Sequence, residues 1–442
     1  MALLIVATVG LGWVAATHPL AGLCILAIMT ALTCCLLMPA HKKLPIGIAG
    51  ALSASVLIPA GTLPVGTLSS FAGPMVGAAW LILFWAQAHQ KLDVSGFATI
   101  WLSTLALGMM GSVISGLYNT YALQVAAFVT LVALAASSVP RAKETLIPKT
   151  IIFLALLQAG LTILETFIMG DLLIQKEAYG KNPFLDGLIR SEGTLGHPLV
   201  AAMIMVLGAS LILATRTNII VKVVSIVIIA AGVVSTGSSS ALVTLMVITA
   251  YAITRGQRPF VTALLWTVSI TFAVLIAGNS RFYTALLGDI SGSNLTHRLN
   301  TVQSAETLVD ERPIFESLLG SGWGTAESLY QRGYLVDDGF YALDNQLIAI
   351  LVSAGLIGVI VFAAGCLHAI LKARRTWRPP IIAAFLMFLA FDVLAWSATG
   401  AIVLCVLCLS TSKANDKNEK FSSVGNNSFS KSYPQTVPEA SN

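Results

Sequence analysis

The sequence predicts an all-α polytopic membrane protein with 12–14 transmembrane helices and one large, partly helical loop outside the membrane. Hydrophobic residues make up 56% of the 442 residues and charged residues only 10%, whereas a soluble domain carries roughly 25% charged residues because its surface faces water. Apolar runs close to the roughly 20 residues that a spanning helix needs recur along the chain. Since the strands of a membrane barrel would show short alternating segments instead, we expect the spans to be helical.

The predicted spans follow one another without a soluble domain between them. The N-terminus is apolar from residue 2 and has no basic segment ahead of the apolar run, so the first span is interpreted as a retained helix and not as a signal peptide. The shortest spans are interpreted as possible re-entrant or paired half-helices, which is why the count is a range. The spans are 2–17, 19–39, 45–61, 73–89, 95–115, 119–138, 149–169, 196–215, 219–235, 239–254, 259–278, 345–371, 379–395 and 397–412.

Short basic clusters between these spans predict the orientation. Lys and Arg mark cytoplasmic loops, and fourteen spans put every cluster and both termini in the cytoplasm. The same count places two long loops, about 170–195 and about 279–344, outside the inner membrane. Because each cluster is confined to a short turn, no nucleic-acid partner is predicted. The clusters lie at 41–44, 139–149, 216–222, 254–258 and 372–378.

The chain is accordingly divided into four parts. Residues 1–148 hold the N-terminal transmembrane helices, and 149–371 hold a core with both outer loops. Residues 372–412 hold the C-terminal transmembrane helices, and 413–442 form a polar tail that we expect to be disordered. Cys405 and Cys408 have a metal-like spacing, but no second pair accompanies them and both lie in an apolar run, so neither a metal nor a cofactor is predicted.

A first group of candidate site residues closes the loop at 170–195. Arg190 and His197 flank a Gly-rich turn, and Pro198 suits the first turn of the following helix. Both side chains would then lie at the outer mouth of the bundle, near a helix N-terminus that favours anions. The alternative is that Arg190 only extends toward lipid headgroups.

The loop at 279–344 holds the second group. It contains four arginines and no lysine, which predicts bidentate recognition of carboxylate or phosphate, although the arginines could also pair with neighbouring acids. We expect an amphipathic helix at 296–309, ended by Arg312 and followed by a glycine-rich turn around Trp323, which either anchors at the headgroups or stacks on a sugar. The arginines are Arg281, Arg298, Arg312 and Arg332.

Four more polar residues lie where the chain enters or leaves the membrane. Asp344 and Asn345 precede the apolar run at 345–371, so Asp344 is either a helix cap or a general base beside a low-dielectric cavity. Glu165 and Asp392 are predicted near the outer ends of their spans, where charges usually face a cavity or a partner. Either carboxylate could pair with an outer arginine.

The order of these motifs resembles that of the O-antigen ligase and polymerase superfamily of bacterial envelope glycan assembly. The resemblance covers about residues 150–370. It departs at Ser239, where the family often has an arginine, and at Asp344, where ligases carry a histidine. The motifs are Arg-x-x-Gly-Thr-x-Gly-His-Pro at 190–198, Thr-Gly-Ser at 236–238, an arginine at 298, Pro-Ile-Phe-Glu-Ser-Leu-Leu-Gly-Ser-Gly at 313–322, Asp-Asn at 344–345 and Gly-Leu-Ile-Gly at 355–358.

The resemblance implies a membrane glycosyltransferase of GT-C-like architecture. Its substrate would be an undecaprenyl-diphosphate-linked oligosaccharide, and its partners would be membrane lipids, a flippase and a chain-length regulator. Because the ligase histidine is replaced, the resemblance favours a polymerase of surface or exopolysaccharide. Arginines would neutralise the lipid diphosphate leaving group, and Asp344 or His197 would serve as the base for the attacking sugar hydroxyl.

Three interpretations therefore remain open. The first is the polymerase, with Asp344, His197 and Arg298 as catalytic residues. The second is ligase-type transfer to a lipid or protein acceptor, or work on a peptidoglycan precursor. The third is a flippase or transporter, which would be expected to show internal repeats and charges near the midplane. The residues assigned to binding of the diphosphate or glycan are Arg190, Arg312, Asn345, Glu165 and Trp323.

Overall fold

The computed structural model describes residues 38–412, except for 59–70, 89, 141–144, 174–179, 186, 216, 255–292, 338, 340 and 375. The predicted spans at 2–17 and 259–278, nearly all of the span at 19–39, and the predicted tail at 413–442 lie outside the described residues. Within them the chain is all-α, as predicted, and the one β-contact is an antiparallel bridge between Lys181 and Ile189.

Most of the described helices fall on predicted spans. The described helices are α3 (Ala40–Leu57), α4 (Ala72–Ala88), α5 (Gly96–Ser115), α6 (Thr120–Ser137), α7 (Leu146–Leu164) with its π-helical end η3 (Glu165–Met169), α8 (Pro198–Ala214), α9 (Ile219–Thr236), α10 (Ser239–Thr254), α13 (Ser293–Asp310), α14 (Ile314–Leu319), α15 (Ala326–Gln331), α16 (Gln346–Lys372), α17 (Arg378–Phe388), η4 (Val393–Ala395) and α18 (Ser397–Thr411). Of these, α13, α14 and α15 lie in the predicted long loop.

Five of the described helices are long and apolar enough to cross a membrane. They are Gly96–Ser115, Thr120–Ser137, Leu146–Met169, Ile219–Thr236 and Gln346–Lys372. Shorter apolar helices accompany these five, α8 and α18 among them, and nearly every residue of α8 is buried. A helix that is apolar all round and buried belongs inside a bundle, so the protein is a multi-pass membrane protein with α8 near its centre.

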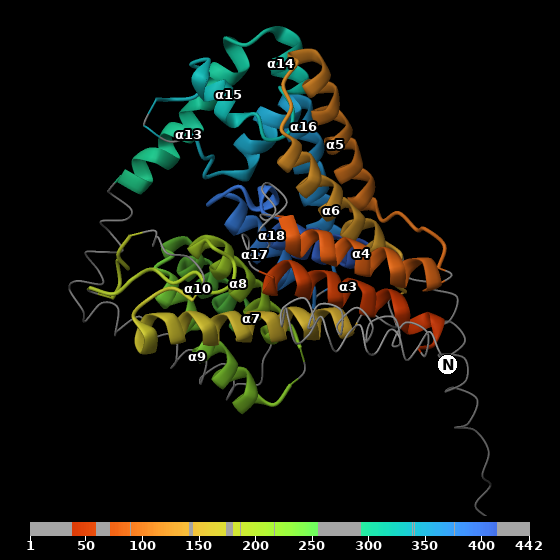
Figure 1. Ribbon diagram of the computed structural model, residues 1–442, viewed down its shortest axis with the longest axis vertical. Helices are drawn as coiled ribbons and strands as arrows, with labels where there is room; N and C mark the ends of the chain where they lie inside the picture. The colour runs from red at the N-terminus through yellow and green to blue at the C-terminus, as the bar shows by residue number, and fades with distance from the viewer. Residues whose placement is uncertain are drawn as a thin grey trace, which may run out of the picture.

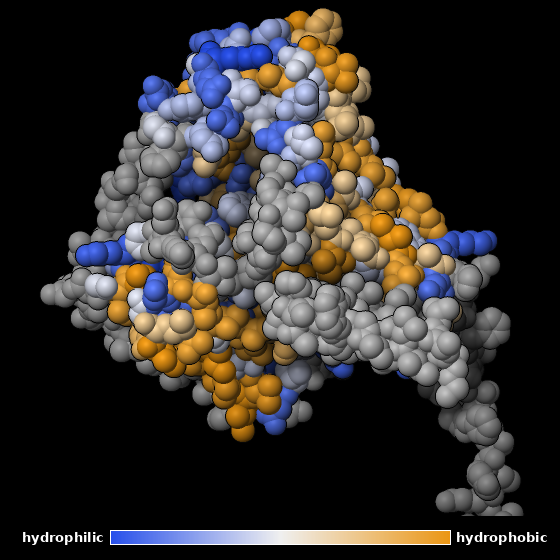
Figure 2. Space-filling model, in the orientation of Figure 1, coloured by the Kyte–Doolittle hydropathy of each residue, from blue (hydrophilic) through white to orange (hydrophobic). Residues whose placement is uncertain are grey.

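Polar segments from the predicted long loop form a lobe at one end of the bundle. Helices α13, α14 and α15 lie above the ends of α5 and α16, whereas α7 to α10 form a separate group lower in the view (Figure 1). Figure 2 shows hydrophilic residues over this lobe and a hydrophobic surface along α5. The predicted helix at 296–309 is confirmed as α13, with Leu308 buried in the lobe and Leu299 and Val302 exposed.

Helix α16 is broken at Gly355, where φ is 68° and ψ is −170°. Such a break frees backbone carbonyls from their helical partners, and the loop after α14 satisfies them. Ser321 N donates to Val352 O at 2.8 Å, and Gly322 N donates to Ser353 O at 3.1 Å. These bonds hold the half-helix before the break against the lobe. Asp344 lies just before the first turn of this half-helix.

The predicted span at 379–395 is too long. Helix α17 ends at Phe388, and the chain turns before the short η4. A straight helix to residue 395 would carry Asp392 into an apolar span, which is costly for a carboxylate. The turn instead places Asp392 beside Trp396, whose Nε1 donates to Asp392 Oδ1 at 3.4 Å.

Candidate active site

The turn that carries Arg190 and His197 is held in place by Glu165. This carboxylate is fully buried and accepts three backbone N–H groups, from Leu173 at 3.0 Å, from Glu192 at 3.0 Å and from Gly193 at 2.8 Å. Charge-assisted hydrogen bonds of this kind compensate the cost of burying a carboxylate. Glu165 therefore organises the loop. Its hydrogen-bond partners are backbone amides and not the arginine that the sequence suggested.

Arg190 leaves this turn toward the end of α9. Its Nε donates to Thr236 O at 3.1 Å, which caps a carbonyl at the C-terminus of α9, where cations are favourable. A Cβ at Gly237, whose φ is 66°, would lie 3.4 Å from the Arg190 side chain. The guanidinium is thus held against the α9–α10 turn, and it does not merely extend toward headgroups.

His197 is the N-cap of α8, and Pro198 lies in the first turn, as predicted. Its Nδ1 accepts the backbone N–H of Leu199 at 3.3 Å, so in the neutral ring the proton is on Nε2. The ring packs on Trp396 with centroids 4.8 Å apart. Burial, with Arg190 adding to it, lowers the pKa of His197 to about 4, so this imidazole is neutral at pH 7 and acts as a donor through Nε2.

Arg298 and Asp344 meet across the entrance to α16. Arg298 Nε lies 3.7 Å from Asp344 Oδ2, which is beyond hydrogen-bond range, and this buried Nε has no hydrogen-bond partner among the described residues. Burial raises the pKa of Asp344, while the charges of Arg298 and His297 oppose that rise. The carboxylate is therefore a stronger base than an ordinary surface aspartate.

These four residues line one cavity of about 250 Å³, which we call the polar pocket. They come from three segments that are far apart in the sequence, and Arg190 lies close enough to influence both His197 and Asp344 electrostatically. The complete lining is Lys181, Pro183, Arg190, His197, Pro198, Leu199, Gly237, Ser238, Ser239, Ser240, Arg298 and Asp344.

Two parts of the polar pocket were not predicted from the sequence. Lys181 lines it through the bridge that joins its strand-like segment to Ile189. The start of α10 lines it with three serines, and Ser238 accepts the backbone N–H of Ala241 at 3.3 Å as the cap. The Thr-Gly-Ser motif at 236–238 was the available signal for this second helix N-terminus.

The polar pocket is built to hold an anion. Three cationic side chains face one carboxylate, with His197 neutral, so the net side-chain charge is positive. Two helices, α8 and α10, begin at its wall, and helix N-termini favour negative charge. A phosphate-bearing group fits this arrangement, and Asp344 provides a proton acceptor beside it.

Arg312 is not in the polar pocket. It is 4% exposed, and its guanidinium donates to Leu308 O at 2.6 Å, Ser321 Oγ at 3.1 Å and Leu351 O at 3.3 Å. Burial lowers the pKa of Arg312 to about 10, with Glu316 opposing, so it is charged at pH 7. The structure gives this arginine the task of joining the lobe to the broken part of α16.

Asn345 and Trp323 also lie outside the polar pocket. Asn345 is the N-cap of α16, since its Oδ1 accepts the backbone N–H of Leu347 at 2.8 Å; the interpretation of Asp344 as that cap is therefore wrong. Trp323 is not a headgroup anchor, because its ring is 9% exposed and lies 5.5 Å from the ring of Trp101. Its Nε1 donates to Leu105 O at 3.3 Å.

Part of this site lies in a segment that is similar to a known family. Residues 224–363 match the model of the O-Antigen ligase family, which confirms over that range the resemblance predicted from the motifs. The matched range contains Arg298 and Asp344 and begins after Arg190 and His197. No curated protein matches the chain.

Proposed function

We propose that this protein is a glycosyltransferase that polymerises undecaprenyl-diphosphate-linked oligosaccharide on the outer face of the cytoplasmic membrane. The observation that carries the proposal is the polar pocket, in which Arg190, His197, Arg298 and Asp344 line one cavity at an end of an apolar bundle. The match of residues 224–363 to the O-Antigen ligase family supports the reaction class. A transporter would place its charged residues nearer the midplane.

The cations of the polar pocket would stabilise the leaving group. When the sugar–phosphate bond breaks, negative charge grows on the diphosphate, and preorganised donors stabilise that charge more in the transition state than in the ground state. Arg298 is well placed for this work, because its buried Nε lacks a hydrogen-bond partner among the described residues. Arg190, fixed on Thr236 O, and Lys181 complete the cationic wall.

Asp344 is the better candidate for the base. His197 is neutral with its Nδ1 already accepting a backbone N–H, so it can donate to a phosphate oxygen but not accept a proton there. Asp344 would take the proton from the acceptor hydroxyl as its oxygen bonds to the anomeric carbon. The bond from that carbon to the diphosphate breaks, and the lipid diphosphate leaves with the bonding electron pair.

The replacement of the ligase histidine by Asp344 favours polymerisation over transfer to a lipid or protein acceptor. In that case the acceptor is a second lipid-linked oligosaccharide, and a flippase and a chain-length regulator would be the expected partners. Both arginines should then be required for long chains.

The experiment is a cellular chain-length assay. A strain lacking the gene is complemented with wild type, Arg190→Ala, Arg298→Ala or the control Arg332→Ala, whose side chain is exposed. We expect the first two variants to give single repeat units while the protein accumulates in the membrane, and Arg332→Ala to give normal chains. Normal chain length in Arg190→Ala and Arg298→Ala would refute the proposal.

A further inference from the structure

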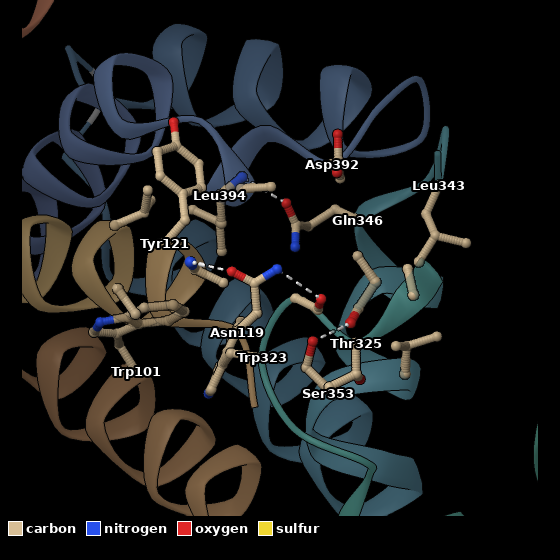
Figure 3. A pocket seen from close by; sticks show the side chains of 18 residues that line it. Trp101, Asn119, Tyr121, Trp323, Thr325, Leu343, Gln346, Ser353, Asp392 and Leu394 are labelled. Carbon is tan, nitrogen blue, oxygen red and sulfur yellow. Dashed lines mark hydrogen bonds between the residues drawn. The ribbon is translucent and has the colours of Figure 1, made fainter. Parts of the chain in front are cut away.

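A second cavity, of about 190 Å³, lies beside the polar pocket, and we call it the aromatic slot (Figure 3). Its walls come from α5, α6, the turn before α15, the first turns of α16 and η4. The rings of Trp101, Tyr121 and Trp323 line it together with small aliphatic side chains, and Gln346 and Asp392 line one side. The slot is therefore mainly apolar with a few polar groups.

Three other polar side chains of the slot already make hydrogen bonds to backbone groups. Asn119 accepts from Ala122 N at 3.1 Å and donates to Gly324 O at 3.3 Å. Thr325 Oγ1 donates to Gly322 O at 2.8 Å, and Ser353 Oγ donates to Ala349 O at 2.8 Å. These side chains shape the slot but have little capacity left for a ligand.

Gln346 is different. It is 2% exposed, and its Oε1 accepts the backbone N–H of Leu394 at 2.8 Å, which fixes the amide so that Nε2 is turned into the slot (Figure 3). Nε2 has no hydrogen-bond partner among the residues that the structure describes. A donor that faces a cavity can bond an acceptor on a ligand, so the slot suits a ligand that brings such an acceptor.

The slot is close to the proposed reaction centre. Leu343 and Gln346 line it, while Asp344 between them lines the polar pocket, and two residues of chain span at most about 7 Å. On the far side, Asp392 accepts from Trp396, whose ring packs on His197. A sugar held in the slot would therefore be held within reach of Asp344.

Three kinds of occupant can be compared by their chemistry. A prenyl chain would match the aromatic walls but leave the Gln346 donor unpaired. An unmodified hexose would bury several hydroxyl groups against walls that offer few free partners, which is costly. An acetamido group has one methyl, one carbonyl and one N–H, which match the apolar wall, the Gln346 donor and a carboxyl acceptor respectively.

We propose that the aromatic slot binds the acetamido group of an N-acetylated hexosamine in the glycan substrate. The methyl packs against Trp323 and Trp101, the carbonyl oxygen accepts from Gln346 Nε2, and the amide N–H donates to the carboxyl of Asp392. A carboxyl oxygen accepts this N–H in either protonation state. This inference rests on the proposed function and specifies the substrate class that the same site selects.

The test is saturation-transfer NMR on the purified full chain with N-acetylglucosamine, glucosamine and glucose. We expect the acetyl methyl protons to receive the strongest saturation and the two sugars without an acetyl group to bind at least about fivefold more weakly. Gln346→Met keeps the side-chain volume and removes the donor together with the acceptor for Leu394 N, and it should weaken N-acetylglucosamine binding about fivefold to tenfold. Gln303→Leu, at an exposed position on α13, should leave binding unchanged.

Equal saturation of glucose and N-acetylglucosamine would overturn the inference. It would also be overturned if a short prenyl phosphate occupied the aromatic slot and the acetylated sugar could not displace it. The comparison of ligands keeps the test valid even where Gln346→Met fails to fold. Transfer activity is measured separately on the same preparation. Acetyl recognition without transfer would contradict only the proposed function, whereas transfer without acetyl recognition would contradict only the aromatic slot.

Discussion

Arg312→Ala should unfold the junction between the lobe and α16 without acting at the polar pocket. The substitution removes three hydrogen bonds from one buried guanidinium and leaves the carbonyl of Leu351 and the Oγ of Ser321 without this donor. A hydrogen bond to a charged group contributes about 1.5–3 kcal/mol, so the loss of three that share one guanidinium should cost about 3–5 kcal/mol. At about 2 °C per kcal/mol for a chain of this size, the Tm should fall by about 6–10 °C.

The assay is thermal unfolding of the purified protein in detergent, with Arg332→Ala as the matched control. Arg332 is exposed at the end of α15, so its Tm should stay within about 1 °C of wild type. Binding of a polyprenyl diphosphate is measured below the transition, where folded Arg312→Ala should bind as wild type does. Two results would refute the reasoning: equal Tm values for the two variants, or a stable Arg312→Ala protein that no longer binds the diphosphate.

Three further predictions concern Asp344, Glu165 and Gly355. Because burial raises the pKa of Asp344 and only its deprotonated form accepts a proton, kcat/KM should fall with decreasing pH before the pH reaches about 3.9, where an ordinary aspartate titrates; a profile that falls only at or below that ordinary pKa would exclude Asp344 as the base. Glu165→Gln puts an amide N–H against backbone N–H donors, so Tm and transfer activity should both drop, whereas the exposed Glu327→Gln should change neither. Gly355→Ala should lower the Tm by several degrees, since its Cβ would lie 2.3 Å from the Leu318 carbonyl carbon at a φ of 68°, while Gly160→Ala, with nothing within 4 Å inside α7, should be neutral or stabilising.

Much of the fold could be predicted because a span is encoded by one continuous apolar run. The ends of α5, α9 and α16 agree with prediction within one or two residues. The break at Gly355 and the early end of α17 were not predicted, because both depend on contacts made by other segments. The carbonyls freed by the break at Gly355 accept hydrogen bonds from Ser321 and Gly322, and the sequence around Gly355 does not show these distant partners.

The site was predicted in part, for the same reason. Charged residues at the ends of apolar spans are expected at the membrane surface. The sequence therefore indicated the four residues that line the polar pocket: Arg190, His197, Arg298 and Asp344. Arg312 was assigned to the substrate, but its guanidinium donates to Leu308 O, Ser321 Oγ and Leu351 O, and these contacts depend on how the lobe folds. Other residues were misplaced or missed where tertiary contacts decide: Trp323, Asn345, Glu165 and Lys181.

The most direct test of the central claim is transfer by the protein reconstituted in liposomes with a lipid-linked oligosaccharide. Wild type should release polyprenyl diphosphate and lengthen the oligosaccharide. Asp344→Asn should bind the donor within about threefold of wild type and lengthen it at least about 100-fold more slowly, the usual loss for a missing general base. Turnover by Asp344→Asn at the wild-type rate, or wild type that binds the donor and yields no longer product, would contradict the account.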